Sequence, residues 1–354
     1  MKYKILHVGP EDKATTLHRY NALIDLGHSV KRIYTIRLSE QPSYSGKREL
    51  SLKRIRRFLS RKAGYPIQSN SENQQILYKI KIEQPDLIFI EKGLTIWPKT
   101  LTDIKKKYPS IKIISFSLDD MKNKMHQSKY YLKSLKLYDI HFTNKRYNVN
   151  ELINMGAKKV YYLSNAYSKS VHKPIKISEK DKLKYGCDIS FVGGYELERF
   201  EMMYYLAENG IRVRVWGNNW HKCKIFHKNL LIENKPAYGD LYGKVICSSK
   251  IVLAFLRKIN RDEETTRSVE IPAFNAFMLA ERSSLHQEMF LEGKEAAFFN
   301  KKEELLEKII YYLNNDSLRK KIADLGYKKC MSLNCSQHDK MSDLLKICFE
   351  NEKD

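Results

Sequence analysis

The fold of this chain is decided by residues 188–217, which read DISFVGGYELERFEMMYYLAENGIRVRVWG. The short apolar run at 188–192 predicts a β-strand, the segment at 198–209 predicts a helix, and the alternating run at 212–216 predicts a second strand. A strand, a helix and a strand in this order form one βαβ unit of a parallel sheet.

The same alternation extends along the chain on both sides of this stretch. In the first half, a helix at 15–26 that ends at Gly27 lies between two short apolar strands. Alternating strands and helices imply doubly wound parallel sheets, so the expected class is α/β with two Rossmann-like domains. The further strands that we expect lie at 4–8, 28–34, 86–91, 112–117, 139–143, 159–163, 250–255 and 276–279, and the further helices lie at 241–249, 266–273 and from Lys302 onward.

The length and composition are those of a two-domain globular protein. The chain has 354 residues, of which 42% are hydrophobic, and this is enough for two buried cores. Residues 166–183 are polar and lack periodicity, so we interpret them as a linker. We therefore expect an N-terminal domain at 1–165 and a C-terminal domain at 184–325, followed by a helical tail at 326–354 that packs back toward the N-terminal domain.

The chain carries no signature of a membrane span or of secretion. Its longest apolar runs are far shorter than the roughly 18 residues of a spanning helix, and the first residues do not form a signal-peptide core. Six cysteines are scattered without CxxC spacing, which indicates reduced thiols and no zinc site. We expect a cytoplasmic protein.

The positive charge lies mainly in the first half of the chain. The formal net charge is +23, and residues 1–150 contain 30 basic and 13 acidic side chains. Such an excess suits nucleic acid, an anionic membrane surface or a phosphorylated small molecule. Nucleic-acid binding is the weakest of these, because no zinc-finger, RNP-like or helix-turn-helix pattern is present.

Residues 46–62 form a basic amphipathic segment with eight basic residues and one acidic residue. Leu52, Ile55, Phe58 and Leu59 fall on one face of the predicted helix. One interpretation is a surface helix whose apolar stripe packs on the first sheet. The other is a peripheral contact with anionic lipid headgroups on the inner face of the cell membrane.

Anion-binding residues gather after the predicted strands of the second half. Gly193 and Gly194 follow one strand and precede a helix that carries Arg199, a pattern typical of either a phosphate loop or a tight turn. The strand at 250–255 leads to Arg257 and Lys258. Since ligands bind beyond the carboxyl ends of parallel strands, these residues are expected at one site.

The next helix adds two kinds of group to the same place. Thr265 or Thr266 can cap its N-terminus. Glu270 lies one turn inside and can accept hydrogen bonds from a diol such as a nucleotide ribose.

The spacing of Arg267, Glu270 and Ala273, with the Gly193-Gly194 pair, Arg199 and Gly217 before it, resembles the C-terminal domain of CgeB-like glycosyltransferases. These proteins are related to glycosyltransferase family 4 and have the GT-B fold, in which two Rossmann-like domains face each other across a cleft. The resemblance implies a metal-independent, retaining, hexosyltransferase-like enzyme without cofactor. It also implies that Glu270 corresponds to the second Glu of the family's two-glutamate motif, which binds the ribose, whereas the first Glu falls on Asp262 and departs from the pattern.

The resemblance further implies transfer of a sugar from a UDP- or GDP-sugar held by the second domain. The acceptor, a glycan, lipid-linked or protein molecule, would bind the first domain, and the process would be bacterial surface polysaccharide or glycoconjugate biosynthesis. Arg257 and Lys258 would offset the charge of the departing diphosphate. The nucleotide-sugar residues that we expect are Gly193, Gly194, Arg199, Gly217, Tyr238, Thr265, Thr266, Arg267 and Glu270.

The first half offers three candidate catalytic residues. Asp119 and Asp120 follow the strand at 112–117, where a carboxylate can orient an acceptor hydroxyl or take its proton, or can simply cap the next helix. His18, beside Arg19 at the start of the first helix, either reaches the donor phosphate or acceptor or forms a surface pair with Arg19.

Two other functions stay open besides nucleic-acid binding. A nucleotide-sugar epimerase shares the two-domain architecture and would convert the donor without an acceptor. A GT-B domain that has lost catalysis would bind glycan only. Glu270, Arg199 and Arg257 argue against the second of these.

Overall fold

The computed structural model describes residues 1–11, 14–35, 52–67 and 71–350. The chain divides into two compact units, the first of residues 1–164 and 338–354 and the second of residues 165–337. It therefore passes from one unit to the other twice, after Ser164 and after Gln337. Each unit contains a six-stranded parallel sheet with helices, which confirms the α/β class.

The sheet of the first unit has the strand order β2-β1-β3-β4-β5-β6, with parallel pairing throughout. The central strand β3 is buried along its whole length, as expected of a strand covered on both faces. All six strands begin and end within one residue of the predicted positions. They are β1 (Lys4–Gly9), β2 (Ser29–Tyr34), β3 (Leu87–Glu91), β4 (Lys112–Ser117), β5 (Ile140–Thr143) and β6 (Val160–Tyr162).

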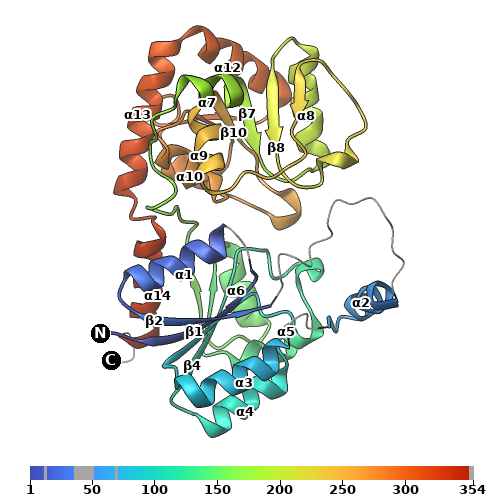
Figure 1. Cartoon of the computed structure of the whole chain (residues 1–354), viewed down its shortest axis with the longest axis vertical. Helices are drawn as coiled ribbons and strands as arrows, with labels where there is room; N and C mark the ends of the chain where they lie inside the picture. Colours follow the sequence, from blue (N-terminus) through green and yellow to red (C-terminus); the bar gives the residue numbers. More distant parts are fainter. Residues whose placement is uncertain (12–13, 36–51, 68–70, 351–354) are drawn as a thin grey trace. The chain divides into compact units, whose positions relative to one another are not determined.

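Helices cover both faces of this sheet. Ile5 and Phe89 pack with α1 and α14 on one face, and Leu6 and Ile88 pack with α3 and α4 on the other, because successive residues of a strand point to opposite faces. Figure 1 shows the last helix, α14, beside the first, α1. The helices are α1 (Thr15–Asp25), α2 (Leu52–Lys62), α3 (Glu72–Glu83), α4 (Pro98–Lys107), α5 (Lys129–Ser134), α6 (Arg146–Asn154) and α14 (Gln337–Phe349).

The sheet of the second unit is also parallel and has the order β12-β11-β10-β7-β8-β9. The strand expected at 276–279 begins two residues later, because Asn275 adopts a positive φ of 58° and Ala276 still bonds back to the preceding helix. The two edge strands of this sheet, β9 and β12, were not predicted from the sequence and have only three residues each. The strands are β7 (Cys187–Val192), β8 (Val213–Trp216), β9 (Leu230–Ile232), β10 (Ser249–Ala254), β11 (Met278–Glu281) and β12 (Ala297–Phe299).

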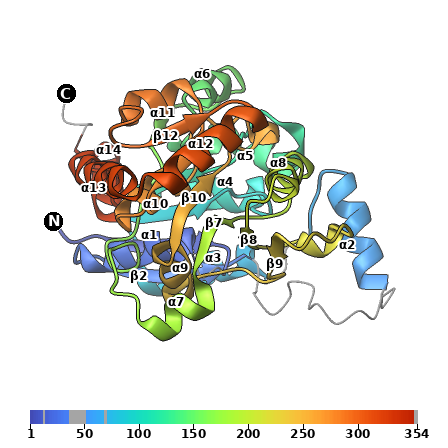
Figure 2. The same ribbon diagram turned by 90° about the horizontal axis from the view of Figure 1, so that it is seen from above.

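Helices again sandwich the sheet. Ile189, Phe191 and Leu253 pack with α8, α12 and α13 on one face. Val192 and Val252 pack with α9 and α10 on the other, and Figure 2 shows α8 and α12 on one side of this sheet and α9 on the other. The helices are α7 (Glu179–Tyr185), α8 (Leu197–Glu208), α9 (Gly239–Cys247), α10 (Arg267–Ala273), α11 (Ser284–Met289), α12 (Lys302–Asn314) and α13 (Asp316–Ser332).

The stretch at 166–183, which the sequence suggests as a linker, lies within the second unit. Tyr167 is buried, pairs with Ser336 in a parallel bridge and accepts a backbone hydrogen bond from Gln337. Backbone pairing rather than a periodic apolar stripe holds this stretch, so its burial leaves little trace in the sequence. The tail expected at 326–354 is divided, since α13 belongs to the second unit and residues 338–354 belong to the first.

A buried ion pair joins α1 to the end of β3. Glu91 accepts hydrogen bonds from Arg19 Nε at 2.9 Å and from Thr16 Oγ1 at 2.9 Å, and it lies 2.8 Å from His7 Nε2. Burial alone would raise the pKa of Glu91, but the charge of Arg19 and the hydrogen bonds hold the pKa well below its usual value. The carboxylate stays ionised and fastens the first helix to the sheet.

We predict that Arg19→Met destabilises the first unit by about 3–5 kcal/mol, because it leaves the Glu91 charge buried without a cation. The double variant Arg19→Met/Glu91→Leu should regain much of this loss, since both charges are then gone. Urea unfolding of the full chain measures both. A double variant no more stable than the single one would contradict the role of the pair.

Candidate functional site

The carboxyl ends of β7, β8, β10 and β11 lie at one edge of the second sheet, because all of these strands are parallel. Gly193 and Gly194 directly follow β7, and Gly217 directly follows β8. Arg257 and Lys258 follow β10 after two residues. The structure therefore brings these five predicted residues to the same edge of one sheet.

Two of the three glycines are required by packing between neighbouring loops. A Cβ at Gly217 would lie 1.8 Å from the carbonyl oxygen of Gly193, and a Cβ at Gly193 would lie 2.4 Å from the Phe191 ring. The Gly193 carbonyl also accepts a hydrogen bond of 2.8 Å from Trp220 Nε1. Around Gly194 the nearest atom to such a Cβ is 3.9 Å away. The geometry thus supports the tight-turn interpretation for Gly193 and leaves Gly194 with open space.

Arg199 is a buried cation at this edge of the sheet. It is only 4% exposed, and its Nη1 donates to the Gly194 carbonyl at 3.2 Å. Burial, together with the charges of Arg267 and Arg257, lowers its pKa to about 10, against the opposing effect of Glu196 at 3.4 Å. Within the described residues, Nε of Arg199 has no hydrogen-bond partner. Three guanidinium groups therefore accumulate here, a setting suited to a multiply charged anion.

Arg257 and Lys258 have carboxylate partners that were not predicted from the sequence. Arg257 Nε donates to Glu196 at 2.9 Å, and Lys258 Nζ lies 2.9 Å from Glu198. The hydrogen bond that Lys258 donates to Glu198 raises the pKa of Lys258. The only sign of these partners in the sequence was the two glutamates, Glu196 and Glu198, shortly after the Gly193-Gly194 pair.

Asp262 stands where the two-glutamate motif of the resembled family has its first Glu. Its carboxylate makes hydrogen bonds within its own loop. It accepts hydrogen bonds from the backbone N–H of Arg257 at 3.3 Å and from Asn260 Nδ2 at 2.9 Å. Its carboxylate therefore fixes the turn that presents Arg257.

The expected threonine cap of α10 is wrong. Thr266 has helical dihedral angles and makes no side-chain cap hydrogen bond, while the Thr265 backbone N–H donates to Ser268 Oγ at 3.0 Å. Ser268 Oγ lies 2.7 Å from His286 Nε2, and His286 Nδ1 lies 2.7 Å from the Glu281 carbonyl oxygen. The carbonyl can only accept, so Nδ1 carries the proton and Nε2 accepts from Ser268. The start of α10 is thus held by hydrogen bonds that link the Glu281 carbonyl, His286 and Ser268, and not by a threonine hydroxyl.

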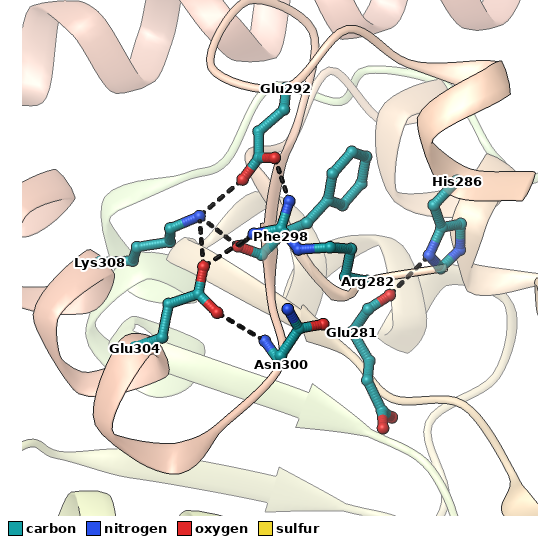
Figure 3. A network of polar contacts seen from close by, with 8 residues as sticks. All are labelled: Glu281, Arg282, His286, Glu292, Phe298, Asn300, Glu304 and Lys308. Carbon is teal, nitrogen blue, oxygen red and sulfur yellow. Dashed lines mark hydrogen bonds and ion pairs between the residues drawn. The ribbon is translucent and has the colours of Figure 1, made fainter. Parts of the chain in front are cut away.

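A charged network, shown in Figure 3, lies beside α11, the helix that carries His286. Arg282, next to the end of β11, pairs with Glu292 and Glu304. Lys308 lies between the same two carboxylates, at 2.6 Å from Glu292 and 3.0 Å from Glu304. These contacts tie β11, the loop before β12 and α12 into one edge of the unit.

Glu270 is almost enclosed. Its side chain is 10% exposed, its Oε2 accepts a hydrogen bond of 3.0 Å from the Tyr242 hydroxyl, and its Oε1 lies 3.8 Å from His172 Nε2. Tyr242 and His172 were not among the predicted site residues. Tyr238 was among the predicted site residues. It is half-exposed at the start of α9, one helical turn before Tyr242.

The candidates of the first unit have different surroundings. Asp119 pairs with Lys92 at 2.5 Å, next to the ends of β4 and β3. Asp120 is buried and accepts from Asn148 Nδ2 at 2.9 Å and from the Lys122 N–H at 3.0 Å. It therefore closes a turn, and the capping alternative is wrong, because Asn123 caps the next helical turn. His18 and Arg19 are both buried, so the surface-pair interpretation is wrong.

Residues 199–345 match the family model described as glycosyl transferase-like. Solved structures agree with the fold. The chain superposes on sucrose-phosphate synthase from Thermosynechococcus elongatus with a TM-score of 0.67 at 9% identity, over 99% of both chains.

Two further solved structures are similar to this chain. A glycosyltransferase from Rickettsia africae gives a TM-score of 0.63 at 15% identity, covering 100% of this chain and 99% of the other. HepE from Anabaena, solved in complex with UDP-glucose, gives 0.64 at 10% identity, covering 98% and 100%. At these identities the similarity shows the fold, which is GT-B, and the CgeB-like subgroup stays a prediction.

A search of curated proteins finds no match to this chain. In the described part of the chain, no helix has the length and apolar character needed to cross a membrane. The same residues contain no group of three or more His, Cys, Asp or Glu side chains arranged to hold a metal ion.

We predict that His286 makes the second unit less stable in acid. Burial lowers its pKa to about 4, so between pH 6.5 and 4 the unfolded chain binds more protons than the folded one. Stability then falls as the pH falls, by about 1.4 kcal/mol per pH unit from this residue. His286→Phe keeps the stacking on Phe298 and removes the titration, so urea unfolding at pH 7, 6 and 5 should show a shallower decline. Equal pH slopes for the variant and the wild type would contradict this role.

Proposed function

We propose that the chain transfers a sugar from a UDP- or GDP-sugar to a glycan, lipid-linked or protein acceptor, with the donor at the carboxyl edge of the second sheet. The observation that carries this proposal is the group of Arg199, Arg257 and Arg267. A buried guanidinium near two like charges is electrostatically costly, as the lowered pKa of Arg199 indicates. A diphosphate bound at this edge offsets this repulsion.

In the proposed reaction, the acceptor oxygen bonds to the anomeric carbon, and the bond from that carbon to the diphosphate breaks. The electron pair passes to the diphosphate oxygen, so negative charge grows there. Arg257 and Lys258 reach this charge by exchanging Glu196 and Glu198 for the phosphates. They supply the stabilisation without a metal ion. Gly194, Gly217, Tyr238, Thr265, Thr266 and Arg267 complete the donor site in this proposal.

Glu270 binds the ribose hydroxyls in this scheme. An ionised carboxylate offers about four acceptor positions, and Tyr242 uses one of them. The carboxylate can accept hydrogen bonds from ribose hydroxyls.

The acceptor is assigned to the first unit. Asp119, with Lys92 beside it, orients the acceptor hydroxyl or takes its proton, and His18 is the second candidate from the same unit. Retention of the anomeric configuration and a place in bacterial surface polysaccharide or glycoconjugate biosynthesis rest on the family resemblance. We place the enzyme in the cytoplasm, peripherally on the inner face of the membrane.

We predict that one nucleotide sugar among the UDP and GDP sugars raises the melting temperature of the protein. Glu270→Gln should weaken binding of the corresponding nucleoside diphosphate about 10- to 150-fold, because hydrogen bonds to a charged acceptor contribute about 1.5–3 kcal/mol. Isothermal titration calorimetry measures the change. Glu307→Gln, on the exposed side of α12, serves as the matched control and should bind like the wild type.

Two results would contradict the proposal. If no nucleotide or nucleotide sugar shifts the melting temperature, the second unit does not bind a donor. If the protein converts the donor to an epimer with no acceptor present, the epimerase alternative holds instead.

The membrane contact is proposed through α2. Phe58 is 65% exposed, Leu59 57% and Ile55 43%, which favours the membrane interpretation over an apolar stripe packed on the sheet. Exposed Arg56, Arg61 and Lys62 share this helix. Residues 46–51 of the basic segment lie outside the described residues.

We predict reversible, salt-sensitive sedimentation of the protein with vesicles of phosphatidylcholine and phosphatidylserine. Phe58→Ser/Leu59→Ser should weaken binding at every salt concentration, whereas Arg54, Arg56 and Arg57 changed together to Ser should remove the salt dependence. Vesicles of phosphatidylcholine alone are the control. Sedimentation that is equally weak for all three proteins would leave α2 as a surface helix.

A further inference from the structure

The loop at 217–229, which connects β8 to β9, carries two adjacent apolar side chains into solvent. Phe226 is 86% exposed and Ile225 is 51% exposed. Single exposed apolar residues are common on protein surfaces, whereas a contiguous apolar patch marks a place where a partner binds. The residues around this pair indicate which kind of partner fits.

Three lysines flank the apolar pair. Lys222, Lys224 and Lys228 are exposed, and none of them forms an ion pair with another described residue. Other lysines of the same unit do form such pairs, as Lys235 does with Glu233 at 3.3 Å. The loop itself contains no Asp or Glu. Its positive charge is therefore not neutralised by the protein, and the complementary partner is an anion.

Both ends of the loop are held to the body of the second unit. Trp220, near one end, is fully buried, and its Nε1 donates to the Gly193 carbonyl at 2.8 Å. Near the other end, Asn229 Nδ2 donates to a backbone carbonyl of α8 at 3.0 Å, and the His227 ring meets Tyr204 edge-on with ring centroids 5.8 Å apart. The tip is therefore presented in a fixed position, and it loses less freedom when a partner binds.

The surface beside the tip limits the shape of this partner. Ile225 lines a groove along α8, and the exposed carboxylates of Glu201 and Glu208 line the same groove. These carboxylates repel an anionic molecule that lies along the helix. A polyanion laid in the groove is thus disfavoured, whereas a flat anionic surface touched only by the tip and its lysines is compatible with them.

An anionic lipid bilayer supplies both kinds of contact that the loop needs. Its boundary between headgroups and acyl chains takes up apolar side chains such as Ile225 and Phe226. Its anionic headgroups attract nearby lysines. A free anion in water would pair with the lysines but would leave the apolar pair exposed.

We infer that the loop at 217–229 is a membrane-docking element of the second unit, which inserts Ile225 and Phe226 at the surface of an anionic bilayer. The inference does not depend on the donor assignment, and it adds a contact to the one proposed for α2 in the first unit. Its use rests on the proposed function. Because Trp220 ties the loop to Gly193, at the edge proposed to bind the donor, docking holds that edge near a lipid-linked acceptor.

The test places a tryptophan at the tip of the loop in the full chain. Phe226→Trp is mixed with vesicles of phosphatidylcholine and phosphatidylserine in which the phosphatidylcholine carries bromine on its acyl chains. Bromine quenches tryptophan only within the bilayer, so this variant should lose fluorescence relative to unbrominated vesicles. Leu291→Trp is the matched control, because Leu291 is 55% exposed next to β12, at the opposite edge of the same sheet. It should be quenched no more than the wild type.

The lysines are tested in the Phe226→Trp protein. Quenching should weaken with added salt and should be absent on vesicles of brominated phosphatidylcholine alone. Changing Lys222, Lys224 and Lys228 together to Ser should weaken vesicle binding through the tip at least tenfold, since each lysine contributes to attraction by anionic headgroups. Quenching that is unchanged by salt and by this triple change would overturn the inference of an anionic surface.

Sedimentation of the same samples separates this inference from the contact proposed for α2. If the protein sediments with vesicles but Phe226→Trp is quenched no more than Leu291→Trp, the loop does not dock and the α2 contact stands alone. If no protein sediments and no tryptophan is quenched, both membrane contacts are wrong.

Discussion

Parallel pairing of the strands in the second sheet is the constraint on which the candidate site depends. It places the carboxyl ends of β7, β8, β10 and β11 at one edge, so residues from distant parts of the sequence meet there. Two kinds of residue occupy that edge. Gly193 and Gly217 allow the loops to pack closely, and Arg199, Arg257 and Glu270 carry charge.

The charges at this edge are balanced only in part. Glu196 and Glu198 pair with Arg257 and Lys258, but Arg199 stays buried near two other guanidinium groups. In the proposed donor site, the glutamates would compete with a diphosphate for Arg257 and Lys258. The affinity for the diphosphate would then be the difference between two sets of contacts.

Local pattern was enough to predict the class, nearly all of the longer strands and the edge at which charged residues gather. Apolar runs and terminating glycines are local features, so 188–217 could be read directly from the sequence. Features that depend on contacts between distant residues could not. The start of α10 depends on His286, 18 residues after Ser268, and the hydrogen bond to Glu270 comes from Tyr242, 28 residues before it. The sequence shows the residue types but not these pairings, and it also hides the pairing of Arg19 with Glu91.

The position of α14 has a consequence for how the protein is made. Met341, Leu344 and Cys348 complete the same core as Ile5 and Leu23, although more than 300 residues separate them. On the ribosome the strands of the first unit are made before the second unit, but they cannot bury that face of their sheet until α14 has emerged. The second unit, a continuous stretch from residue 165 to 337, is complete earlier. The domain that is started first is thus the one finished last, and until then its apolar face is exposed to chaperones and to aggregation.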